Sequence, residues 1–210
     1  MMAHFNFVFL TCLGKTPSHV DGAQGNIFTV TNTRPISVGN CDNRLLTNAI
    51  RLRIASIIEP YISKIQRELL KGRFLLTNVV DIDQAAMTVS LKTENGCIVL
   101  FDFKAAFPSI SREFLWKTFK GLGMPEPLIR ALQCFYISNR HIINVKGQMF
   151  LSFTTFSGIK QGCPLSPLLF ALAVDIFLKR LEREFPSATT RAFADDLAMV
   201  TDIFSVMVTD

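Results

Sequence analysis

The sequence predicts an α+β fold, and three groups of strands and helices carry that prediction. Residues 97–103 form an apolar run broken only by Asp102, which is typical of a strand. Residues 141–146 and 149–156 alternate around Lys146-Gly147, and residues 190–193 and 197–200 flank an acidic pair. Both patterns predict antiparallel hairpins, and the stretches between them carry helical periodicity.

Helical spacing of apolar residues and capping signals predict helices over residues 43–62, 82–92, 112–120, 127–138 and 166–185. Pro60 is expected to end or kink the first. Ser111 suits an N-cap, and Ser166 suits an N-cap followed by Pro167 at the first helical position. Residues 14–40 are rich in Gly, Pro, Ser, Thr and Asn and predict loops with short strands.

Composition predicts a packed globular chain without a membrane span. The chain has 210 residues, 49% of them hydrophobic, yet no apolar run reaches the length of about 18 residues that a span needs. The apolar start, Phe5 to Leu13, is short and lacks a basic flank, which favours a buried strand over a signal peptide. Five scattered cysteines without Cys-x-x-Cys spacing predict reduced thiols and a nuclear or cytoplasmic, not secreted, protein.

Positive charge is concentrated in the first part of the chain. Residues 1–80 hold nine of the 22 Lys/Arg but four of the 17 Asp/Glu, whereas residues 81–210 are balanced. A localised basic surface suits a polyanion such as nucleic acid or a triphosphate. The alternative is a set of solvated helix faces.

Three carboxylates occupy unusual positions. Asp102 ends the predicted buried strand, and Asp195-Asp196 stand at a predicted hairpin tip. If the two segments meet, their oxygens can hold two magnesium ions for phosphoryl transfer. Taken alone, an Asp-Asp pair is more often a solvated turn.

The segment from Ser157 to Pro167 combines two glycines, two prolines and a glutamine before a helix. Gly162 allows a close backbone approach, and Gln161 can hydrogen-bond a ligand. The alternative is an ordinary loop that leads into a helix.

These segments, in this order, resemble motifs A, B and C of reverse transcriptases, most closely those of non-LTR (LINE-type) retrotransposons. Motif A resembles Phe101–Phe107, motif B resembles Ser157–Phe170, and motif C is Phe193-Ala194-Asp195-Asp196. Upstream, Thr33–Ser37 with Asn40 is similar to a fingers motif of the family.

A second fingers motif matches only in part. Gln66 and Gly72-Arg73 fit it, but Glu68-Leu69 stand where Gly-Phe is usual. Pro108 likewise replaces an aspartate that usually follows the aromatic residue of motif A.

The resemblance implies the fingers and palm of a right-hand polymerase, with an antiparallel palm sheet backed by helices. Residues 1–96 would be the basic, fingers-like part and residues 97–210 a palm. The chain ends 14 residues after Asp196, so we expect the thumb to be absent. The implied partners are an RNA template, a DNA primer and dNTPs, with no membrane; no protein partner is indicated.

The resemblance also implies site residues. Asp102 and Asp195 would bind both metal ions, Asp196 would be the third carboxylate, and the Phe103 carbonyl would complete a shell. The ions would be two Mg²⁺, with Mn²⁺ as a substitute.

Around the incoming nucleotide, Phe107 would be a steric gate against the ribose 2′-hydroxyl, although a core aromatic is its alternative. Gln161 and Gly162 would line the pocket. Arg34 and Arg73 would contact the triphosphate, which suits the guanidinium fork.

Two other functions compete with an RNA-directed DNA polymerase. One is a truncated, inactive retroelement remnant with residual nucleic-acid binding, which the early end of the chain suggests. The other is an RNA-directed RNA polymerase. It is disfavoured because Phe193-Ala194 precedes the acidic pair where glycine is usual there, and because Phe107 would obstruct ribonucleotides.

Overall fold

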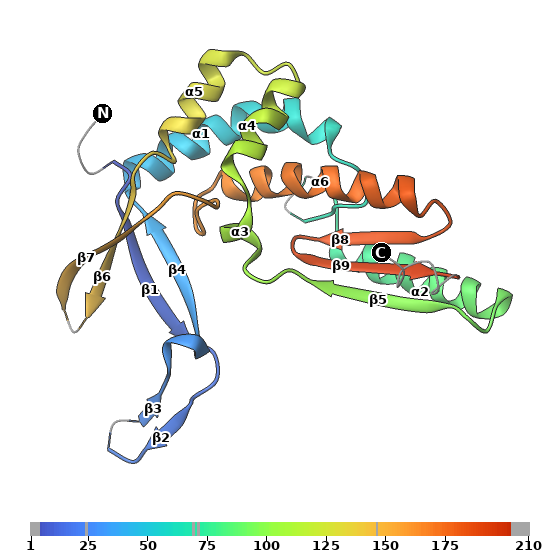
Figure 1. Ribbon diagram of the computed structural model, residues 1–210, viewed down its shortest axis with the longest axis horizontal. Coiled ribbons are helices and arrows are strands. Elements are labelled where there is room, and N and C mark those ends of the chain that lie inside the picture. Colours follow the sequence, from blue (N-terminus) through green and yellow to red (C-terminus); the bar gives the residue numbers. More distant parts are fainter. Residues whose placement is uncertain (1–4, 24, 69, 71, 146, 203–210) are drawn as a thin grey trace.

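The computed structural model confirms an α+β fold (Figure 1) and describes residues 5–23, 25–68, 70, 72–145 and 147–202. Its strands form a four-stranded sheet, a three-stranded sheet and a short two-stranded hairpin in the described residues. Helices lie over and between the two larger sheets (Figure 1). No helix in this part of the chain is long and apolar enough to cross a membrane.

The four-stranded sheet joins segments that are far apart in the sequence. Its order is β4–β1–β6–β7, with bounds Thr33–Gly39, Val8–Gly14, Asn139–Val145 and Gln148–Thr155. β1 pairs antiparallel with β4 and parallel with β6, while β6 and β7 form the predicted hairpin. The sheet therefore draws strands from both sides of the predicted boundary at residues 96 and 97. The β2–β3 hairpin (His19–Asp21 and Gly25–Ile27) projects from its end (Figure 1).

The three-stranded antiparallel sheet has the order β5–β9–β8, with bounds Cys97–Asp102, Asp196–Thr201 and Thr189–Phe193. The prediction of a buried strand at 97–103 is wrong. Within the described residues β5 is an edge strand that pairs with β9, and Ile98 and Leu100 are 52% and 77% exposed. The continuous apolar run therefore predicts a strand correctly, but one face of that strand is exposed.

The core is built mainly by helices. Helix α6 (Ser166–Glu184) is buried along most of its length, and α1 (Cys41–Ile58), α4 (Arg112–Gly121) and α5 (Glu126–Cys134) share its core. The short η2 (Glu59–Tyr61), η1 (Val30–Asn32) and α3 (Ala106–Ser109) connect larger elements. Fully buried core side chains, each contributing about 1.5–3 kcal/mol of transfer free energy, include Leu115, Phe119, Ile129, Leu132, Leu169 and Leu178.

Of the two predicted N-caps, Ser111 is confirmed and Ser166 is not. The amide of Phe114 donates to Ser111 Oγ at 3.2 Å, which confirms that N-cap. Ser166 is instead the first helical residue, after an N-cap at Leu165. Helix α2 (Leu75–Lys92) begins seven residues before the predicted start. Its first turns lack a side-chain cap, and Val79 and Val80 there are residues that favour strands.

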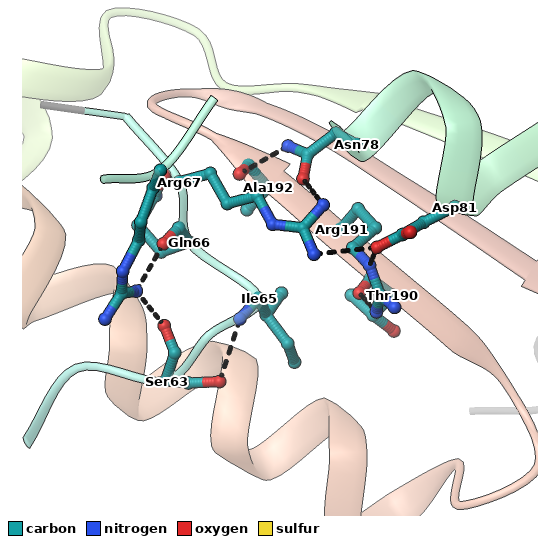
Figure 2. A network of polar contacts seen from close by, with 10 residues as sticks. Ser63, Ile65, Gln66, Arg67, Asn78, Asp81, Thr190, Arg191 and Ala192 are labelled. Carbon is teal, nitrogen blue, oxygen red and sulfur yellow. Dashed lines mark hydrogen bonds and ion pairs between the residues drawn. The ribbon is translucent and has the colours of Figure 1, made fainter. Parts of the chain in front are cut away.

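A polar network fastens α2 to β8. Asp81 Oδ2 on α2 accepts from Arg67 Nη2 at 2.7 Å and from Arg191 Nε at 2.6 Å (Figure 2). Asn78 Nδ2 donates to the carbonyl of Ala192 at 2.9 Å. The hydrogen bond from Arg191, and then that from Arg67, lower the pKa of Asp81.

Replacing Asp81 with Asn should make stability less dependent on pH. A lowered carboxylate pKa contributes stability above its unfolded value of 3.8, and that contribution is lost as pH falls through the folded pKa. Because the site is partly solvated, we expect Asp81→Asn to cost about 1 kcal/mol at pH 7. The cost at pH 3 should be smaller than the cost at pH 7. Urea unfolding at both pH values measures it, with Asp83→Asn on the exposed side of α2 as control; equal costs at both pH values would contradict the assignment.

Candidate active site

The strand register brings the acidic segments together. Asp102, the last residue of β5, is the direct Cα partner of Asp196, the first residue of β9. Asp195 precedes Asp196 in the tight turn after β8. The structure therefore places all three predicted carboxylates at one end of the three-stranded sheet.

Their side chains are not gathered around a single point. Asp102 and Asp196 are exposed and Asp195 is half-buried. Within the described ranges, no three Asp, Glu, His or Cys side chains are arranged to hold a metal ion. The donor set of carboxylate oxygens suits a hard cation such as Mg²⁺. The backbone therefore fits a metal site, while the side chains would have to turn toward an ion.

A further carboxylate, Glu68, lies within electrostatic range of this pair. The pKa of Glu68 is raised, first by partial burial and then by the negative charges of Asp195 and Asp196. The sequence marked Glu68 only as a departure from the family motif. The like-charge part of this shift reflects the negative charge of the acidic pair, which suits a cation.

The turn that carries Asp195 is hydrogen-bonded to Gln66, a residue outside the β8–β9 hairpin. Ala194 adopts a left-handed backbone with φ of 54°. Gln66 Nε2 donates to the Ala194 carbonyl at 3.2 Å, and the Ala194 amide donates to Gln66 Oε1 at 3.1 Å. Sequence patterns place Gln66 in a motif but give no sign of this contact.

The motif B loop packs on the motif A loop. The amide of Ile159 donates to the Phe107 carbonyl, and that of Gly158 to the Ile110 carbonyl, each at 3.0 Å. Gly158 has φ of 74°, and a Cβ there would lie 2.5 Å from the Pro108 carbonyl oxygen. The close contact between the two loops therefore requires glycine at position 158. Pro108, which replaces the usual aspartate, is part of this contact.

The aromatic side chains of motif A rest on α6. The Phe107 ring stacks on Phe170 with centroids 4.7 Å apart and an interplanar angle of 12°. Phe103 meets Phe177 edge-on at 6.0 Å. Both motif A rings are only partly buried, so Phe107 is packed firmly yet still reachable.

Gln161 lines a cavity of about 220 Å³ between the four-stranded sheet and the motif B loop. Pro35 and Ser37 of β4 line the same cavity. Gly162 follows with φ of 81°, and a Cβ there would lie 2.6 Å from the Ser37 carbonyl oxygen. The loop therefore touches β4, as the prediction of a close approach at Gly162 requires.

The two predicted triphosphate contacts lie apart. Arg34 is exposed on β4, and strand alternation puts it on the face opposite Pro35. The Arg73 guanidinium donates to the carbonyls of Gln66 at 2.6 Å, Ile62 at 3.1 Å and Ser63. In this arrangement Arg73 stabilises the segment of residues 62–66 by hydrogen bonds.

The structure adds Arg112 and Lys160 to this region; Lys160 lies within motif B, although its sequence position indicated no role of its own. Arg112 donates to four backbone carbonyls around the motif B loop. Lys160 is 9% exposed and lies over the Tyr136 ring at 5.7 Å. Burial, the largest cause, lowers the pKa of Lys160 to about 8.

Comparisons with known proteins give the family. Residues 21–207 match the family described as reverse transcriptase (RNA-dependent DNA polymerase). The Pol polyprotein of the Drosophila melanogaster type-2 retrotransposable element R2DM is 30% identical over 178 residues, covering 80% of this chain and 16% of that protein. A 149 kDa protein of the Xenopus laevis transposon TX1 is 24% identical over 186 residues, covering 84% of this chain and 14% of that protein.

Solved structures support the same fold. A Candida albicans telomerase in complex with a fragment of telomeric RNA superposes with a TM-score of 0.62 at 12% identity, covering 97% of this chain and 39% of that one. The fingers and palm arrangement is therefore confirmed as the fold class. With the sequence matches, it follows that the chain belongs to the reverse transcriptase family and is similar to proteins of non-LTR retrotransposons.

Proposed function

We propose that this chain carries the catalytic centre of an RNA-directed DNA polymerase that adds dNTPs to a DNA primer on an RNA template. The observation that carries the proposal is the direct pairing of Asp102 with Asp196, with Asp195 in the adjoining turn. The family match, described as RNA-dependent DNA polymerase, supports an RNA template.

Reverse transcriptases generally use divalent metal ions, and the three carboxylates would bind them here. Asp102 and Asp195 would bind both ions, Asp196 would add a third carboxylate, and the Phe103 carbonyl would complete a shell. Mg²⁺ suits these oxygen ligands, with Mn²⁺ as a substitute. When bound, two such ions activate the primer 3′-hydroxyl and stabilise the leaving pyrophosphate.

The residues around this centre would hold the nucleotide. Phe107, packed on Phe170, would stand where a ribose 2′-hydroxyl has to pass. Gln161 and Gly162 would border the nucleotide and template. Arg34 stays a candidate for the triphosphate, whereas Arg73 would act through the loop that it braces.

Primer extension tests the proposal. The full chain is incubated with a DNA primer annealed to an RNA template, dNTPs and Mg²⁺. We expect template-directed extension with dNTPs and little with NTPs. Absence of dNTP incorporation with either Mg²⁺ or Mn²⁺ would overturn the proposal.

Phe107→Ala should weaken sugar discrimination. Removing the ring opens the space where the 2′-hydroxyl would be excluded, so kcat/KM for NTPs relative to dNTPs should rise about tenfold or more, which is about 1.4 kcal/mol. Single-nucleotide incorporation of dCTP and CTP measures the ratio. Phe150→Ala, at a half-exposed ring on β7, is the matched control; an unchanged ratio in Phe107→Ala would argue for a purely packing role.

A second candidate is a chain that binds nucleic acid without polymerising. The excess of basic residues before position 80 favours it, because these residues would provide the binding surface. Filter binding at increasing salt separates the candidates when extension is absent. Affinity that falls steeply with salt indicates phosphate-driven binding, and affinity that ignores salt excludes it.

A further inference from the structure

The backbone conformation of Ala194, the residue before the acidic pair Asp195-Asp196, depends on one side chain. Ala194 has φ of 54°, a region that alanine rarely adopts. Both of its backbone polar groups bond to the carboxamide of Gln66, at 3.2 Å and 3.1 Å. The same Oε1 atom also accepts from the amide of Glu68 at 3.1 Å. Gln66 therefore fixes the residue immediately before Asp195.

The Gln66 side chain extends a short ladder beyond the end of β8. The amide of Ala192 donates to the Ile65 carbonyl, and the amide of Arg67 donates to the Ala192 carbonyl, each at 3.1 Å. Gln66 is thereby paired in parallel with Ala192 and is 0% exposed. The Gln66 carboxamide bonds to Ala194, two residues after Ala192, in the way that the next peptide group of a paired strand would.

The segment that carries Gln66 is anchored to two helices. The Ser63 amide donates to Asp175 Oδ1 on α6 at 2.7 Å. Arg67 donates to Asn78 at 2.9 Å and to Asp81 at 2.7 Å on α2 (Figure 2). These bonds fix the Gln66 backbone from both sides, so its side chain is a firm support for the turn.

We propose that Gln66 is a positioning residue that sets Asp195 and Asp196 against Asp102 for metal binding. The inference deepens the proposed function and rests on it for the role of the three carboxylates. The chemistry requires a donor and an acceptor on one planar group, because Ala194 offers both an amide and a carbonyl. Methionine has neither group, and asparagine is one methylene too short to reach both.

The test compares Gln66→Met with two controls. Gln84→Met makes the same change at an exposed position on α2. Ile129→Val trims a fully buried residue on α5, which lies away from the β8–β9 turn (Figure 1), and so supplies a general destabilisation that leaves the Gln66 contacts in place. Broadening of the amide NMR signals of residues 194–196 is titrated with Mn²⁺ alone, and hydrogen exchange of the Ala194 amide is followed in the same samples.

We expect Gln66→Met to raise the half-saturating Mn²⁺ concentration about tenfold, the usual effect of losing an outer-shell support. Exchange of the Ala194 amide should accelerate by at least about tenfold, because its acceptor is lost. In primer extension, kcat should fall about tenfold with KM for primer–template unchanged, and added Mg²⁺ should restore part of the rate. Both controls should match the parent chain in the Mn²⁺ titration.

The outcomes separate this inference from the polymerase assignment. If the parent makes no DNA but Gln66→Met still shifts the Mn²⁺ titration and Ala194 exchange, the positioning role stands and the polymerase proposal fails. If the Mn²⁺ midpoint is unchanged, or if Ile129→Val shifts it equally, the positioning role is overturned. Should Gln66→Met fail to fold, Gln66→Asn retains a buried carboxamide and is judged by the same titration.

Discussion

Asp195→Asn should abolish dNTP incorporation by the chain, with a loss of at least about 1,000-fold, or about 4 kcal/mol of transition-state stabilisation. The substitution keeps the size of the side chain and removes a charged metal ligand. Because Asp195 follows Ala194 in a turn held by Gln66, no other described carboxylate can take its backbone position. Single-turnover primer extension with saturating Mg²⁺ measures the loss.

The same variant should not be less stable than the parent. Asp195 raises the pKa of Glu68 through like-charge repulsion, so removing its charge relieves the acidic pair. Thermal unfolding should give an equal or higher Tm, while Asp83→Asn changes neither activity nor Tm. An active Asp195→Asn chain would remove the basis of the metal-site proposal, and a strongly lowered Tm would show that the loss of activity reflects misfolding.

Arg112→Ala should strongly destabilise the fold. The guanidinium donates to the carbonyls of Gly158 at 2.8 Å, Tyr136 at 2.9 Å, Ser157 at 3.0 Å and Thr155 at 3.3 Å. It also lies 5.3 Å from the Tyr136 ring centroid. Since each unsatisfied buried acceptor costs about 1–3 kcal/mol and water reaches part of the site, we expect a loss of about 3 kcal/mol.

Urea unfolding followed by circular dichroism measures this cost. Arg112→Lys should recover little of it, because an ammonium group cannot reproduce the planar fork. Arg130→Ala removes an arginine whose side chain is 73% exposed and should change stability by less than about 0.5 kcal/mol. A similar small cost for Arg112→Ala would mean that the four carbonyls are satisfied without it.

The sequence was sufficient to predict which segments meet but not how they are supported. Asp102 and Asp195-Asp196 could be assigned to one site because three motifs occur in order. The bonds of Gln66 to Ala194 could not, since a glutamine carries no periodic or capping signal that identifies a partner 128 residues away. Arg73 illustrates the reverse case. Its residue type suits phosphate, yet nearby carbonyls occupy its guanidinium in the fold.

The exposure of a strand and the limits of a domain could not be predicted from the sequence, because both depend on which strands pair in the fold. The apolar sequence around Leu100 predicts a strand correctly, but only the sheet order reveals that β5 lies at an edge. Similarly, residues 141–146 and 149–156 predict a hairpin from local alternation, while the parallel pairing of β6 with β1 is a contact between distant segments. Whether the chain divides at residues 96 and 97 stays a prediction, although the pairing of β1 with β6 joins strands from both sides of that limit.

The parallel pairing of β1 with β6 has a consequence for synthesis on the ribosome. Val8 reaches its partner His141 only after more than half of the 210 residues have been made. Until then one edge of the β1–β4 ribbon is open, and such an edge can recruit other nascent chains. Completion of the four-stranded sheet should therefore be a late step in biogenesis, and chaperone demand should be greatest before residue 145 has emerged from the exit tunnel.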